Sequence, residues 1–138
     1  MNNMNAFSQV NWIAVVLGAV FSMALGFLWY GPLFGKVWLR SIGKKADDLS
    51  SSAGMYVFAF LGALVSAYVL AALIGALGIT VWWHGAVLGA VVSLGIGSMA
   101  ALVNGIFHRV PALAWLLFAL YQLLLNAVEG LVFAVWRL

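Results

Sequence analysis

The chain has no cysteine and very little charge, and both shortages narrow what it can be. Without cysteine it forms no disulfide, thiolate nucleophile or cysteine metal site, and it gives no hint of redox compartment. Charged residues make up 7% of the sequence and hydrophobic residues 67%, so no polar coat can cover a water-facing surface. The apolar surface must therefore be solvated by lipid, and the sequence predicts an integral membrane protein.

Basic residues before the first apolar run are also lacking. A secretory signal begins with such residues, and Met1 to Val10 has none, so we expect the first apolar run to be retained. The net charge of +3 rests on only six lysines and arginines, which lie beside apolar runs. Charges so placed set membrane topology and meet anionic lipid headgroups, and we expect no nucleic-acid partner.

Four long apolar runs follow one another along the chain. Each is long enough to cross a hydrocarbon layer of about 30 Å. The predicted spans are residues 12–30, 55–77, 83–107 and 112–136, with a basic loop at 31–54. Gly31-Pro32 is predicted to end the first helix. The expected fold is all-α: a single domain, 1–138, of four transmembrane helices packed as a bundle.

The positive charges predict how the spans are oriented. The first loop holds four of the six basic residues and the third loop holds Arg109, so loops 31–54 and 108–111 should be cytoplasmic and both termini non-cytoplasmic. Tryptophan prefers the membrane interface, and the seven tryptophans fall near predicted span ends. The outer rim would be marked by Trp12, Trp82, Trp83 and Trp136, and the inner rim by Trp29, Trp38 and Trp115.

The basic loop begins with an amphipathic pattern. The apolar face comprises Leu33, Phe34, Val37, Trp38 and Ile42, and the basic face Lys36, Arg40 and Lys44, with Lys45 following. This pattern predicts a short interfacial helix after the first span. It would anchor the loop in the lipid headgroups; recognition of a specific lipid or partner is the alternative.

Small residues recur every four positions in the third span. They are Gly85, Gly89, Ser93, Gly97, Ala101 and Gly105, and Gly18, Ser22 and Gly26 form a shorter series in the first span. Because lipid gives helices no hydrophobic drive to associate, such residues allow the close backbone approach that packing requires. We expect another helix to lie in the groove that they form.

Glu129 is the one carboxylate within a predicted span. A charge at membrane depth costs several kcal/mol, so this group should be protonated, paired or facing a wet cavity. Asn126 and Gln122 lie on the same helix face. This polar stripe predicts hydrogen bonds that hold helices or protomers together. The alternatives are a proton or cation relay through Glu129 and the binding of a ligand or lipid.

A second polar cluster is predicted near the other end of the last two spans. Asn104 and His108 share a face of the third span, and Tyr121 on the returning helix lies at a similar depth. These groups could hydrogen-bond across the hairpin. Catalysis is not expected, because His84 and His108 lie at opposite rims and no rim offers enough ligands for a metal; no cofactor is implied either.

The segment from Gly26 to Trp38, GFLWYGPLFGKVW, resembles the signature of a small membrane family called domain of unknown function 1761. That family shows Gly-x-x-Trp-Tyr-Ser-Pro followed by Phe-Gly-Lys-x-Trp, and Gly31 stands here where serine is commoner. The resemblance implies the fold and the membrane location, and it transfers no activity. The leading expectation is an oligomeric structural, scaffolding or lipid-interacting protein. The alternative is a small transporter or channel that uses Glu129 at an oligomer interface to move a proton, cation or small molecule.

Overall fold

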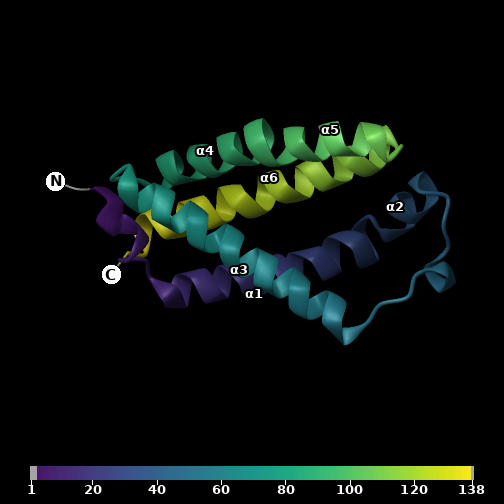
Figure 1. Cartoon of the computed structure of the whole chain (residues 1–138), viewed down its shortest axis with the longest axis horizontal. Helices are drawn as coiled ribbons and strands as arrows, with labels where there is room; N and C mark the ends of the chain where they lie inside the picture. Colours follow the sequence, from purple (N-terminus) through teal and green to yellow (C-terminus); the bar gives the residue numbers. More distant parts are fainter. Residues whose placement is uncertain (1–2, 138) are drawn as a thin grey trace.

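A computed structural model describes residues 3–137, which form four long helices joined by one long loop and two short connections (Figure 1). The long helices are α1 (Trp12–Leu28) with a π-helical turn (Trp29–Leu33), α3 (Ala53–Ala76), α4 (Trp82–Val92) joined to α5 (Met99–Phe107) by a π-helical turn (Ser93–Ser98), and α6 (Ala112–Val135). Each of the four is long and apolar enough to cross a membrane. The predicted all-α fold with four spans is confirmed, and the chain is a multi-pass membrane protein.

Short helices fill the remaining segments. A 3-10 helix covers Asn3–Phe7, and another covers Ala46–Asp48 in the long loop. Between them, α2 (Gly35–Ser41) forms where the amphipathic pattern predicts a helix after the first span. The chain ends lie together at one end of the bundle, and α2 lies at the other (Figure 1).

The first span starts at a side-chain cap that also ties the two chain ends together. The Asn11 side-chain oxygen accepts hydrogen bonds from the backbone N–H groups of Ile13 and Ala14. These are two of the N–H groups that the first turn of a helix leaves unpaired. The Asn11 amide donates in turn to the carbonyl of Trp136, at 3.2 Å.

Gly31-Pro32 does not end the first helix, contrary to the prediction. The helix continues to Leu33 as a π-helical turn, in which the Phe34 N–H reaches the Trp29 carbonyl at 2.9 Å. This wider turn absorbs proline, which has no N–H to donate. Trp29, the first residue of this turn, is buried between helices, with its indole N–H donating to the Leu117 carbonyl at 3.0 Å.

The α4 and α6 helices pack most closely, through glycine. A Cβ added at Gly85 would overlap the carbonyl of Gly130, and one added at Gly89 would overlap the carbonyl of Asn126. The backbones therefore touch where side chains would otherwise separate them. A cluster of buried apolar residues from α1, α3 and α6 fills this end of the bundle; it includes Val15, Ala67, Ile74 and Phe133.

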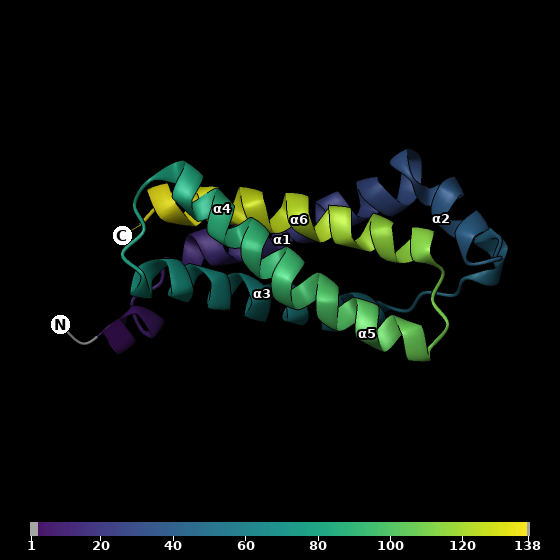
Figure 2. The same ribbon diagram turned by 90° about the horizontal axis from the view of Figure 1, so that it is seen from above.

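The small-residue groove does not continue through Gly97 as predicted. The π-helical turn adds one residue to the helical repeat, so that Ser98 is buried and Gly97 is exposed with open space around it. Beyond this turn α5 diverges from α6, as Figure 2 shows. Figure 1 shows α3 diverging from α6 on another side, so the bundle is open toward the end that carries α2.

Candidate functional site

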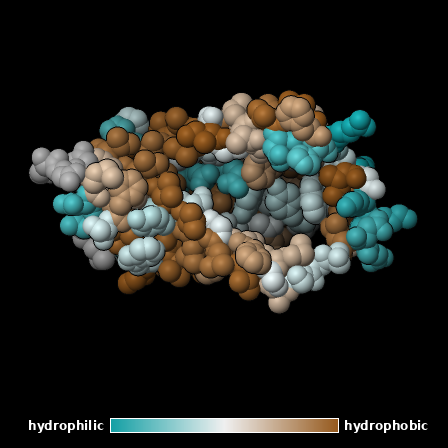
Figure 3. Space-filling model, in the orientation of Figure 1, coloured by the Kyte–Doolittle hydropathy of each residue, from teal (hydrophilic) through white to brown (hydrophobic). Residues whose placement is uncertain are grey.

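The diverging helices leave a cavity of about 840 Å³ in the side of the bundle. Its walls come from α1, α3, α5 and α6, and residues around α2 close its end. Figure 3 shows the hollow in this face, with pale residues on its floor, hydrophobic residues along its left side and hydrophilic residues at its right end. The hollow thus opens on the side of the bundle, between α3 and α5.

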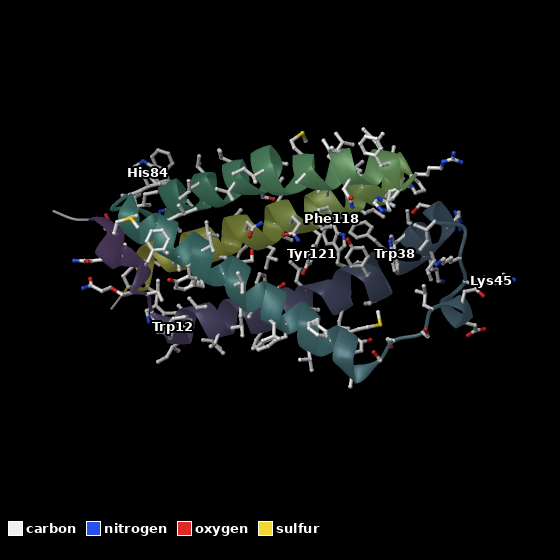
Figure 4. All side chains as sticks on the ribbon, in the orientation of Figure 1. Trp12, Trp38, Lys45, His84, Phe118 and Tyr121 are labelled. Carbon is white, nitrogen blue, oxygen red and sulfur yellow. The ribbon has the colours of Figure 1, made fainter. Side chains whose placement is uncertain are left out.

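Aromatic rings form much of the cavity wall. Tyr30 lies at the centre, with its ring centroid 5.8 Å from that of Tyr121 and 5.1 Å from that of Trp38. Trp115 and Phe118 extend this surface along α6. Figure 4 shows Trp38, Phe118 and Tyr121 gathered at the end of the bundle that carries α2. Such a wall is suited to an apolar or cationic ligand, because rings offer both apolar area and a negative face.

Tyr121 fixes α6 to α1 at the inner end of this wall. Its hydroxyl donates to the Ser22 carbonyl at 2.7 Å and lies 3.1 Å from the Ser22 hydroxyl. The expected hydrogen bonding across the α5–α6 hairpin is therefore replaced by a bond to the first span. Asn104 lines the cavity from α5, and the exposed His108 ring contacts the Asn104 carbonyl within its own turn at 2.9 Å.

A smaller chamber of about 290 Å³ adjoins the cavity. The two share Ser22, Met23, Ala59 and Tyr121 in their linings. Glu129 and Gln122 of α6 face the smaller chamber, with Gly62 and Ser66 opposite on α3. We call this smaller space the Glu129 chamber. It lies beside the aromatic cavity, and its lining is the more polar of the two.

Glu129 itself is nearly enclosed. Its side chain is 3% exposed, and it lies against Gly18 of α1, where an added Cβ would come within 3.1 Å of Oε1. Within residues 3–137 no hydrogen bond or ion pair reaches its carboxyl group. The group lies inside one chain between α1, α3 and α6.

The predicted polar stripe is divided between two surroundings. The Asn126 amide donates to the Gln122 side-chain oxygen at 3.3 Å, and Asn126 is 9% exposed beneath α4. Gln122 and Glu129 line the chamber, and Asn126 does not. Two of the three residues thus share one site, and the third links the site to the close contact between α4 and α6.

The basic residues lie away from both cavities. Those expected at the lipid headgroups, Lys36, Arg40, Lys44, Lys45 and Arg109, are all exposed on α2, its loop and the α5–α6 turn. Figure 4 shows Lys45 at the far end from the termini. No lysine, arginine or histidine is among the described residues that line the two cavities. Glu129 therefore faces no positive charge supplied by the walls.

Several lining residues were not identified as a site from the sequence. The series Gly18, Ser22 and Gly26 was interpreted only as a packing motif, yet these residues face Glu129 and Tyr121. Gly62 and Ser66 of α3 also line the chamber. A spacing of four places residues on one helix face. It does not say whether that face meets a helix or a cavity.

The fold and the site define a class: a four-span membrane protein with an aromatic cavity in the side of its bundle and a buried carboxyl group in the adjoining chamber. The model of a family described as protein of unknown function (DUF1761) matches residues 13–134. The chain belongs to this family, as the Gly26 to Trp38 segment indicated. No curated protein and no solved structure matches it.

Proposed function

We propose that this protein binds a lipid or lipid-like molecule that enters its cavity from the bilayer. The cavity of about 840 Å³ between α3 and α5 carries the proposal. Its volume is within the range of small-molecule sites, and it combines mostly apolar walls with a few polar groups, as such sites do. A hydrocarbon chain can reach it without crossing water.

The small share of charged residues, 7% of the sequence, also supports a role within the membrane. The exposed basic residues are grouped at the α2 end, where they would hold the loop against anionic headgroups. Under this proposal loops 31–54 and 108–111 are cytoplasmic and both termini are not. In sealed, right-side-out spheroplasts, a cysteine introduced at Ala46 should be protected from a membrane-impermeant thiol reagent. It should react only after the membrane has been made permeable.

Retention of lipid tests the proposal directly. The protein would be purified in nanodiscs, released in the gas phase and weighed intact, which reports bound molecules and the number of chains together. Ala101 lines the cavity and the adjacent Ala100 does not, so the same substitution at each position makes a matched pair. We expect Ala101→Phe to lose the bound molecule and Ala100→Phe to keep it.

Two results would count against lipid binding. One is wild-type protein that carries no specific molecule after lipid is stripped away; the other is equal retention by the two phenylalanine variants. The homo-oligomer expected from the small residues stays a prediction, and the same mass measurement counts its chains. Glu129 would belong to each chain separately in such an assembly, since its chamber is formed by α1, α3 and α6 of one chain.

A further inference from the structure

The Glu129 chamber combines enclosure with an unused hydrogen-bonding group. Glu129 is 3% exposed, and among residues 3–137 nothing donates a hydrogen bond to its carboxyl group or pairs with it. Buried carboxyl groups are normally satisfied, because leaving one without a partner is costly. Space beside the group, about 290 Å³ of it, is left for a partner that the chain does not supply.

The other polar groups of the chamber specify the chemistry of that partner. Ser22, Ser66, Tyr121 and Gln122 can each accept or donate a hydrogen bond, and Gln122 Oε1 already accepts one from Asn126. The selective feature is charge, because no basic side chain lines either cavity within the described chain. An anionic headgroup would meet Glu129 with no compensating charge. A protonated amine instead brings three N–H donors and a positive charge to a group that lacks both.

The aromatic cavity specifies the rest of the molecule. It opens between α3 and α5 and adjoins the chamber, with which it shares Ser22, Met23, Ala59 and Tyr121. A hydrocarbon chain attached to the amine would pass these residues to lie in the larger cavity. Tyr30 and Tyr121 stand along this path with ring centroids 5.8 Å apart. Their faces favour a passing cation as well as a hydrocarbon chain.

We propose that the Glu129 chamber is a binding site for the protonated amine of a single-chain amphiphile whose hydrocarbon part lies in the aromatic cavity. This inference rests on the proposed function, because it names the class of molecule that the cavity takes. The carboxyl group binds the amine by charge-assisted hydrogen bonds, and no covalent step is involved. Gly18 has no side chain, and this leaves room for the carboxyl group, because an added Cβ would come within 3.1 Å of Oε1.

Dodecylamine and dodecanol make a matched pair of probes, since they share a chain and differ in the group that would reach Glu129. Binding to the full chain in nanodiscs can be followed by tryptophan fluorescence, because Trp38 and Trp115 line the cavity. We expect the amine to bind about tenfold or more tightly than the alcohol, the difference typical of a hydrogen bond to a charged group. Glu129→Gln should remove most of this preference.

A second pair of variants leaves Glu129 untouched. Gly62 lines the chamber and Gly97 does not, and an added Cβ meets open space at both. Gly62→Leu should fill the chamber and abolish the preference for the amine, and Gly97→Leu should keep it. Equal binding of amine and alcohol by the wild type, or an amine preference that survives Glu129→Gln and Gly62→Leu, would overturn the inference. In either case, lipid that the wild type retains and Ala101→Phe loses would still support the proposed function. Wild-type protein that retains no lipid would reject both the proposed function and this inference.

Discussion

The two ends of the bundle use the same residue types for opposite purposes. At the end that carries the termini, Gly85 and Gly89 bring α4 into backbone contact with α6. Toward the other end Gly62 and Gly97 have open space where a side chain would lie: Gly62 faces the chamber, and Gly97 lies on the exposed surface of its helix. Small residues thus permit close packing without imposing it. What decides the outcome is the register of the helix that carries them.

The π-helical turn at Ser93–Ser98 marks the boundary between these two regions. The close end holds the larger buried apolar cluster, and the open end holds the cavity beside a smaller cluster of Leu25, Trp29, Tyr121 and Leu125. Ligand sites are commonly built on rigid scaffolds. The close end would serve as that scaffold, and substitutions should therefore affect stability at one end and binding at the other.

The largest effect is expected at the close end. Gly89→Leu would drive a side chain into the backbone of Asn126, so α4 and α6 would have to separate. We expect a loss of about 3 kcal/mol in the free energy of unfolding, at the upper end for overpacking. Unfolding in mixed micelles with increasing denaturing detergent measures it. Gly97→Leu is the control, and equal losses in the two variants would erase the contrast between the ends.

A smaller effect is expected where the chain ends are tied. Asn11→Ala removes the cap of α1 and the bond to the Trp136 carbonyl. We expect the free energy of unfolding to fall by about 1–2 kcal/mol. Asn11→Ser keeps an oxygen for the cap and loses the amide donor, so it should lie between the alanine variant and the wild type. Serine as damaging as alanine would show that the tie to Trp136 matters more than the cap.

At the open end, loss of a hydrogen bond should lower the free energy of unfolding by less than loss of the Asn11 side chain does. Tyr121→Phe removes the bond to Ser22 and keeps the ring in the cavity wall. Side-chain hydrogen bonds inside membranes contribute about 0.6 kcal/mol on average, and we expect a loss of that size. Ser22→Ala leaves the Ser22 carbonyl in place and should cost less. A loss in Tyr121→Phe as large as in Gly89→Leu would mean that the cavity wall, too, is part of the scaffold.

The sequence predicted the spans to within a few residues, because apolar runs and their flanking charges are local features. It did not predict either π-helical turn. Gly31-Pro32 has the composition of a helix break, and nothing local to residues 93–98 shows that one extra residue enters the turn. The shift that buries Ser98 and exposes Gly97 depends on packing against α6, so it could not be predicted from the spacing alone.

The candidate site was predicted in part for the same reason. Glu129 stood out because a carboxyl group within an apolar span is rare, and that property is visible in one helix. The partner of Tyr121 was not visible, since Ser22 lies 99 residues earlier in the chain. Gly62 and Ser66 could not be assigned to the site either, because only the packing of α3 opposite α6 brings them to the chamber.

The smallest effect on stability is expected at Glu129 itself. Glu129→Gln keeps the size of the side chain, and no bond within the described residues is lost, so the free energy of unfolding should change by less than about 0.5 kcal/mol. Gly18→Ala is a useful companion, because its Cβ would press on the carboxyl group and on Phe133 at 3.1 Å. We expect this variant to be the less stable of the two. If Glu129→Gln proved as damaging as Asn11→Ala, the carboxyl group would be holding helices together, and the rigid scaffold would extend to the chamber that we assign to a ligand.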